Sequence, residues 1–150
     1  MAVSIRIISR TFAAGLALCF ALTAAASDIG QIKVSKGQVS IERGGQTVQA
    51  AVGAHVQTSD VIKTGGDGSV GITMSDNSLL SAGPNSVVSL DRFAFDAATN
   101  QGQFDTSLRK GSLSVVSGRI AKQSPDAMTV RTPSAILGVR GTEFAVSVDD

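Results

Sequence analysis

A strand-like apolar pattern, interrupted by two glycines and one arginine, occupies Thr132-Pro133-Ser134-Ala135-Ile136-Leu137-Gly138-Val139-Arg140-Gly141-Thr142-Glu143-Phe144. Glycine takes positive φ angles closed to other residues, so the chain can bulge at Gly138 and Gly141 and turn a long side chain toward backbone carbonyls. Arg140 offers five fixed N–H donors for such contacts. A bulge at Gly141 would also bring Glu143 within pairing distance of Arg140. The segment therefore predicts an irregular strand tied by its arginine.

Arg140 is the residue of this segment whose role most needs an explanation. An arginine flanked by Gly and Val and followed by Phe144 is well placed to be desolvated, and a desolvated guanidinium must find acceptors. We interpret it as a buried or half-buried side chain that ties irregular backbone together. The alternative is a recognition residue for an anionic ligand or a partner carboxylate. Thr132-Pro133 indicates a strand end, because Pro133 lacks an N–H and is confined to an edge or a bend.

Alternating apolar positions recur beyond the N-terminus and predict short strands. They are Ile32/Val34, Val39/Ile41, Val70/Ile72/Met74, Phe93/Phe95, Leu113/Val115 and Phe144/Val146/Val148. Clusters of Gly, Asn, Asp, Ser and Pro separate them, as in hairpin turns. No sustained helical apolar stripe follows residue 26, so long helices are not expected, apart from a short turn at 97–100 or 124–127. The chain is predicted to be all-β, a twisted β-roll or sandwich of short antiparallel strands.

Two pairs of segments resemble each other within the chain. Lys36-Gly37-Gln38-Val39-Ser40-Ile41 is similar to Lys110-Gly111-Ser112-Leu113-Ser114-Val115, and the segment 62–72 is similar to 130–139. Two similar halves wrapped into one roll would explain this echo, and chance similarity in a chain rich in Gly, Ser and Val is the alternative. Under the first interpretation, Phe93 to Leu108 is the linker, and its apolar side chains close the core between the halves.

The N-terminal residues carry the features of a secretory signal peptide. Two arginines precede a run of apolar and small residues, and Ala24-Ala25-Ala26 provides a small-residue cleavage site before Ser27. The run is short for a membrane span. We expect residues 1–26 to be removed near Ala26/Ser27. That leaves residues 27–150 as one all-β domain, periplasmic or secreted, with no stable membrane span.

Composition excludes several classes of function. The full chain of 150 residues has 13 basic and 12 acidic side chains, so no net charge steers it toward nucleic acid or anionic membrane. Its single cysteine, Cys19, lies in the expected leader, which leaves the mature domain no thiol for a disulfide, an iron–sulfur cluster or a nucleophile. Stacking platforms for sugars or single-stranded nucleic acid are poorly supplied, since the chain has no Trp and no Tyr.

The sequence contains no recognised catalytic or metal-binding spacing. His55 is the only histidine, so it cannot form a two-histidine zinc site, and we expect it on the surface. The loop from Gly65 to Val70 begins like a calcium-binding β-roll repeat, but Val70 stands where that repeat needs Asp. A hairpin turn is the better interpretation. The aspartates are scattered singly beside Gly, Ser and Asn, as turn-formers are. We predict neither enzymatic activity, nor a metal, nor a cofactor.

The segment from Thr132 to Phe144 resembles the signature of the FecR-type periplasmic sensor domain. In that family a Thr-Pro dipeptide precedes a Gly-Val-Arg-Gly-Thr-x-Phe core, and this chain has Thr132-Pro133 and then Gly138-Val139-Arg140-Gly141-Thr142-Glu143-Phe144. The similarity extends back through Lys36 to Ile41, Asp60 to Gly65 and Asp76 to Ser78. Ser59 and Asn77 replace glycines of the family pattern. Asn tolerates left-handed geometry, so the turn at Asn77 should be preserved.

The resemblance implies a sensor rather than an enzyme. Domains of this family sit in the periplasm, receive a signal from a TonB-dependent outer-membrane transporter and relay it through a membrane helix to a cytoplasmic segment that binds a sigma factor. This chain matches the sensing part only. It is therefore expected to be a non-catalytic module that binds a ligand or an envelope protein, such as a transporter or sensor component, without its own cytoplasmic relay. The alternative is a structural envelope or surface protein with no signalling role.

The last predicted strand bears on how a partner would bind. Phe144, Val146 and Val148 alternate with small residues, and Asp149-Asp150 starts a turn where the family usually continues into a returning strand. Either the domain lacks its final strand or that edge is free. We expect a partner strand to add to exposed N–H and C=O groups, with neighbouring side chains setting the choice of partner.

Overall fold

The computed structural model describes residues 26–149, which form many short strands and little helix. In chain order the elements are β1 (Asp28–Lys36), β2 (Val39–Arg43), β3 (Gln46–Gln49), β4 (His55–Gln57), β5 (Val61–Thr64), β6 (Ser69–Met74), β7 (Leu79–Ala82), β8 (Val87–Phe95), β9 (Gly102–Val116), α1 (Arg119–Gln123), the 3-10 helix η1 (Pro125–Ala127), β10 (Met128–Arg131), β11 (Ile136–Gly138) and β12 (Glu143–Val148). The signal peptide expected at residues 1–26 lies outside the described residues except for Ala26. No helix within 26–149 is long and apolar enough to cross a membrane.

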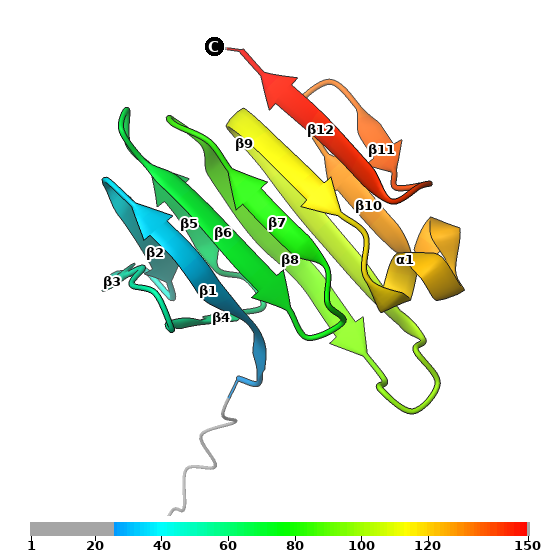
Figure 1. Ribbon diagram of the computed structural model, residues 1–150. Helices are drawn as coiled ribbons and strands as arrows, with labels where there is room; N and C mark the ends of the chain where they lie inside the picture. Colours follow the sequence, from blue (N-terminus) through cyan, green and yellow to red (C-terminus); the bar gives the residue numbers. More distant parts are fainter. Residues whose placement is uncertain (1–25, 150) are drawn as a thin grey trace, which may run out of the picture.

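The long strand β9 belongs to two layers of sheet and joins them (Figure 1). Its first half pairs with β8 and, in parallel, with β10, whereas its second half pairs antiparallel with β7 and β12. The front layer of Figure 1 has the order β4-β1-β6-β7-β9-β12, and the back layer has the order β3-β2-β5-β8-β9-β10-β11. The two layers curl around one core as a half-barrel, which confirms the all-β prediction.

Alternate side chains of both layers fill this core. In β6 and β7 every second residue is buried, and the residues between them face outward. Phe104, Leu108, Leu113 and Val115 of β9 are at most 1% exposed, because β9 has a layer on either side of its bend. Burying one such side chain contributes roughly 1.5–3 kcal/mol. All six alternating runs seen in the sequence lie in strands.

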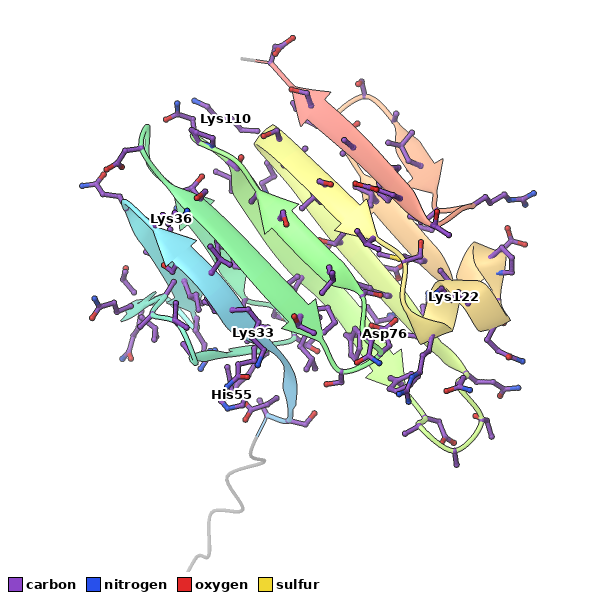
Figure 2. The ribbon with its side chains drawn as sticks, viewed as in Figure 1. Lys33, Lys36, His55, Asp76, Lys110 and Lys122 are labelled. Atoms are coloured by element: carbon purple, nitrogen blue, oxygen red, sulfur yellow. The ribbon has the colours of Figure 1, made fainter. Side chains whose placement is uncertain are left out.

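Two glycines mark places where the chain passes from one layer to the other. Gly37 lies between β1 and β2 with a φ of 65°, and Gly111 lies within β9 with a φ of 87°. Figure 2 shows Lys36 and Lys110, the residues that precede these glycines, toward the same end of the molecule. This part of the internal echo has a structural counterpart. The other part does not, because β5 and β6 lie in different layers, whereas β10 and β11 form one hairpin.

The segment from Phe93 to Leu108 is a hairpin, contrary to the linker expected from the echo. β8 and β9 pair along its length, and Phe93 packs edge-on against Phe104 with ring centres 5.2 Å apart. The apolar alternation on both sides of the turn lets pairing continue to the tip, so no unpaired linker remains. Of the two predicted helical turns, 124–127 contains η1, and 97–100 is the hairpin turn.

Candidate interaction surface

Residues 132–135 form the turn between β10 and β11. The N–H of Thr132 donates to the carbonyl oxygen of Ala135 at 2.8 Å, and the N–H of Ala135 donates to Oγ1 of Thr132 at 3.1 Å. Pro133 is exposed at the bend, outside the β10–β11 ladder, so its missing N–H removes no ladder hydrogen bond. The prediction that Thr132-Pro133 ends a strand is confirmed, since β10 ends at Arg131.

The two glycines of the C-terminal segment have different conformations. Gly141 has a φ of 132°, a positive angle as expected. Gly138 lies within β11 in register with Thr129 and has no positive φ, so the bulge expected there is wrong. The chain leaves the back layer just after it. Val139 is 4% exposed, and its N–H donates to the carbonyl oxygen of Met128 at 3.0 Å.

Arg140 lies on the surface and not in the core. Its side chain is 75% exposed, and its guanidinium pairs at 2.7 Å with Asp126 of η1, which is itself 84% exposed. The expectation of a buried arginine tying irregular backbone is therefore wrong, and its ion-pair partner is Asp126 and not Glu143. The physical reason is that Val139 points inward where the chain passes from β11 in the back layer to β12 in the front layer. The next side chain then projects into water, where a guanidinium needs no protein acceptor.

Ser117 ties together the crossing from β11 to β12. Its N–H donates to the carbonyl oxygen of Thr142 at 2.8 Å, and its Oγ donates to the carbonyl oxygen of Gly141 at 2.6 Å. Ser117 is 3% exposed, so water does not compete for these bonds. Reasoning from sequence missed this residue. A lone serine after an apolar run gives no signal beyond its place before Gly118.

β12 is an edge strand with one apolar face. It pairs antiparallel with the second half of β9, in a register that sets Phe144 opposite Val115. The side chains of Phe144, Val146 and Val148 are half-buried against the core, whereas the residues between them are exposed. Within residues 26–149 no strand pairs with the other edge of β12. The terminal strand expected from the alternation is confirmed.

The register of β12 fixes which backbone groups point to its free edge. The bond from the Ser117 N–H to Thr142 makes these two a hydrogen-bonded pair, and such pairs alternate along an antiparallel ladder. The N–H and C=O groups of every second residue after Thr142 therefore face β9. Those of Glu143, Ala145 and Ser147 face away from it. Three donors and three acceptors are thus directed to the free edge.

A groove of about 610 Å³ opens between β12 and the β10–β11 hairpin. The turn 132–135 and Leu137 line one side, and Val146 to Asp149 line the other, with Arg109 of β9 also contributing. Figure 1 shows β11 and β12 beside each other on this side of the molecule. Leu137, Val146 and Val148 are only partly buried against the core. The core is therefore less completely covered here than along β9.

An ion pair between the half-exposed Arg43 and the buried Asp60 joins the β2 strand to the turn that precedes β5. Asp60 is 0% exposed and accepts hydrogen bonds from Nε and Nη2 of Arg43, at 2.8 and 2.7 Å, and from the N–H of Gln57 at 2.8 Å. The hydrogen bond to Asp60 raises the pKa of Arg43, although burial opposes that shift. The sequence pattern indicates Asp60 only as a turn-former and gives no sign of its partner Arg43.

Asp76 is a second buried carboxylate, and it joins the β6–β7 turn to α1. Its carboxylate accepts hydrogen bonds from the N–H and Oγ of Ser78, at 3.0 and 2.8 Å, and from the N–H of Ile120 at 3.3 Å. Its backbone carbonyl accepts from the N–H of Arg119 at 2.8 Å. Figure 2 shows Asp76 where the hairpin turn approaches the helix. All these contacts are internal, so the residue acts as a structural joint. Asn77, beside it, has a φ of 66°, as its turn requires.

His55 lies on the surface, as expected, at the opposite end of the molecule from Lys110 (Figure 2). Its side chain is 55% exposed, and its Nδ1 lies 3.6 Å from an Oδ2 of Asp28. Among the side chains of residues 26–149, no group of three or more His, Cys, Asp and Glu could hold a metal ion. The groove beside β12 lies along the edge of that strand that is unpaired within the described residues.

Comparison with known proteins bears on the C-terminal part of the chain in particular. A family model described as FecR protein matches residues 60–150, which is more than half of the chain. The match begins at the buried Asp60 and includes β5 to β12. It therefore includes the strands that form the groove and the free edge of β12. Searches of curated proteins and of solved structures found no match.

Proposed function

The chain belongs to the FecR protein family, and on that premise we propose that it is a non-catalytic sensing or protein-interaction module that binds a partner in the periplasm. The family is one of regulatory and sensing proteins, and it is typically associated with the cell envelope. An envelope protein, such as an outer-membrane transporter or another sensor component, is the class of partner that this membership suggests. The family signature, Thr132-Pro133 and Gly138 to Phe144, would then serve to build the binding side of the fold.

The observation that carries this proposal is the open side of the half-barrel. β11 and β12 each have a strand neighbour on one side only within residues 26–149, and a groove with both apolar and polar lining residues lies between them. Groups left unpaired at a sheet edge bind extended chains by main-chain hydrogen bonds, and side chains beside them select the sequence. The family signature, from Thr132 to Phe144, includes the turn that lines the groove, the end of β11 and the first two residues of β12.

The proposed location depends on removal of residues 1–26 and export of residues 27–150. Periplasmic fractionation by osmotic shock should release the protein, and mass spectrometry of its N-terminus should find Ser27 first. A protein that stays in the cytoplasmic fraction with an intact N-terminus would refute this part of the proposal.

Partner binding can be tested at defined positions in living cells. A photo-crosslinking amino acid at Ser134, which lines the groove, should give one discrete crosslinked product in the periplasm. The same amino acid at the exposed Thr47 of β3 is the matched control and should not give that product. A purified protein that is monomeric by light scattering and captures nothing from periplasmic extract, with no crosslink at Ser134, would contradict the proposal.

One observation favours the second candidate, a structural envelope or surface protein. On the outer face of the front layer, Ala145, Ser114, Ser81 and Gly71 lie in register across four neighbouring strands. These residues are small and uncharged, and a row of this kind lets another copy approach closely. Concentration-dependent sedimentation that the substitution Ser81→Arg abolishes, without any partner present, would favour this function over sensing.

A further inference from the structure

We propose that β12 is the docking strand and that its occupant is an extended segment of another protein, apolar at alternate positions and basic at both ends. The inference rests on the proposed function, since it names the edge and the chemistry of the partner. It is carried by four properties of β12: its length, its backbone groups, its apolar face and its charges.

Length distinguishes β12 from the other strands with a free edge. Within residues 26–149 four strands have one strand neighbour only, and they are β3, β4, β11 and β12. β12 has 6 residues, whereas β3 has 4 and β4 and β11 have 3 each. All the residues of β3 are exposed, so that edge has no apolar face to offer. β12 provides the longest ladder for an incoming chain.

The backbone of β12 presents a regular set of hydrogen-bonding groups. The N–H and C=O groups of Glu143, Ala145 and Ser147 point to the free edge, as the pair formed by Ser117 and Thr142 requires. The side chains of Ala145 and Ser147 are small and exposed, so they leave room for a neighbouring strand on the outer face. An extended chain can therefore continue the front layer by one strand.

The inward side chains of such a chain would enter the groove. Val146 and Val148 lie on the inner face of β12, and Leu137 lies across the groove from them. Side chains of an added strand point alternately to the two faces, so every second residue would lie beside these apolar groups. The roughly 610 Å³ of the groove has room for several aliphatic side chains. Thr132 and Ser134 also line the groove, so the apolar residues of the segment are expected where it passes Leu137, Val146 and Val148.

Charge selects the outward residues of the segment. Glu143 and Asp149 stand at the two ends of the outer row of β12, both exposed, and neither forms a hydrogen bond or an ion pair within the described residues. Opposite charges on adjacent strands stabilise pairing, and like charges destabilise it. Arg109 and Asp149 both line the groove, so the groove itself carries opposite charges. The preference for basic residues therefore concerns the outward side chains of the added segment.

The same charges disfavour a second copy of this chain as the occupant. Antiparallel self-pairing centred on Val146 would use the full strand and keep both apolar faces inward. It would also set Glu143 directly opposite Asp149 at both ends. Two pairs of opposed carboxylates make this arrangement unfavourable, so a different protein is the better occupant.

The test uses the purified protein and two fluorescent heptapeptides as probes. One peptide is Lys-Val-Thr-Val-Thr-Val-Lys, and the other has glutamate in place of both lysines. By fluorescence anisotropy the lysine peptide should bind at least tenfold more tightly than the glutamate peptide, and Glu143→Lys should narrow this preference. In amide NMR spectra the lysine peptide should shift and protect Ala145 and Ser147. Equal affinity for both peptides, or no binding of either at millimolar concentration, would overturn the inference.

A proline substitution tests the edge directly. Ala145→Pro removes an N–H that faces the free edge and leaves the β9 ladder intact, so binding of the lysine peptide should be lost. Thr47→Pro is the matched control, because the register of the β2–β3 hairpin directs its N–H to another free edge. Binding that survives Ala145→Pro would overturn the inference. If circular dichroism shows that Ala145→Pro does not fold, the Glu143→Lys result decides.

The outcomes separate this inference from the proposed function. Suppose that Ser134 crosslinks to a periplasmic partner but neither peptide binds. This result would overturn the choice of β12 and of the segment, and it would still support the sensing role. A dimer that Ala145→Pro disrupts would make a second copy the occupant and overturn the inference. Absence of any periplasmic partner, despite tight binding of the lysine peptide, would instead contradict the sensing role.

Discussion

The Oγ of Ser117 donates a hydrogen bond of 2.6 Å to the carbonyl oxygen of Gly141 and so ties the end of β9 to the start of β12. Ser117→Ala would leave that carbonyl without its partner in a site that is 3% exposed. We expect the free energy of unfolding to fall by about 1–2 kcal/mol. Urea denaturation measures this loss, and hydrogen exchange should show faster opening of β12 than of β8.

Ser114→Ala is the control for this prediction. Ser114 lies on the same strand, faces outward in register with Ala145, and no described hydrogen bond involves its hydroxyl. Its replacement should change stability by less than about 0.5 kcal/mol. Equal losses for the two variants would show that Ser117 has no special role in fixing β12.

Gly111 packs so closely against Ser86 that no side chain fits between them. A Cβ on Gly111 would lie 2.2 Å from Oγ and 2.5 Å from Cα of Ser86, at a φ of 87°. Gly111→Ala should therefore cost about 3 kcal/mol or more, from overlap and backbone strain together. Gly44→Ala separates the two causes, since its φ is 56° but nothing lies within 4 Å. It should cost only about 1 kcal/mol in thermal or urea unfolding. Similar losses would mean that packing at the layer crossing is looser than the structure shows.

Arg43 neutralises the carboxylate of Asp60, which is 0% exposed. Arg43→Gln would leave that charge buried without its cation and should cost about 3 kcal/mol. Lys63→Gln breaks the half-exposed pair with Glu42 and should cost less than about 1 kcal/mol. A loss for Arg43→Gln no larger than for Lys63→Gln would contradict the structural role of the pair between Arg43 and the buried Asp60.

The pH dependence of this pair has a definite sign. The pKa of Arg43 is raised by its hydrogen bond to Asp60, so the resulting stability is fully present below the ordinary arginine pKa. It is lost only as the pH rises through the raised value. The difference in unfolding free energy between the parent protein and Arg43→Gln should therefore stay constant from about pH 6 to pH 10. A steady decline across this range would mean that another group controls the pair.

Arg140, despite its place in the family signature, should contribute little to stability. Its ion pair with Asp126 joins side chains that are 75% and 84% exposed, and such pairs are worth about 0–1 kcal/mol. Arg140→Ala should thus lower the unfolding free energy by less than about 1 kcal/mol, and that small loss should shrink further in 0.5 M salt. A loss of several kcal/mol would show that the arginine has buried partners in solution.

The contrast between Arg140 and Val139 shows where reasoning from the sequence succeeds and fails. Alternation predicted β12 and the inward side chains of Phe144 and Val146, because strand periodicity is a local property. At the crossing between layers the period breaks, and which of two neighbouring residues turns inward depends on where β10 and β9 lie. Nothing in the local sequence contains that information, so the sequence pattern wrongly predicts a buried or half-buried Arg140.

The partners of buried polar groups could not be predicted for a related reason. Asp60 and Asp76 were recognised as turn residues, since Asp beside Gly, Ser and Asn is typical of turns. Their burial depends on Arg43 and on Ile120, which are 17 and 44 positions away along the chain. Only the tertiary fold brings these groups together, whereas the strand β12 itself follows from local alternation.

Asp76 provides a test of whether α1 depends on a single buried carboxylate. Asp76→Asn keeps the size of the side chain but turns an amide NH2 toward either Ser78 or the N–H of Ile120, where a donor would face a donor. We expect a loss of about 2–3 kcal/mol in urea unfolding. Asp126→Asn, at a carboxylate that is 84% exposed, is the control and should change stability by less than about 1 kcal/mol. Hydrogen exchange should show α1 and the β6–β7 turn opening together in Asp76→Asn, because the same carboxylate binds both. Faster exchange confined to α1 would mean that Ser78 alone keeps the turn closed and that the joint is not shared.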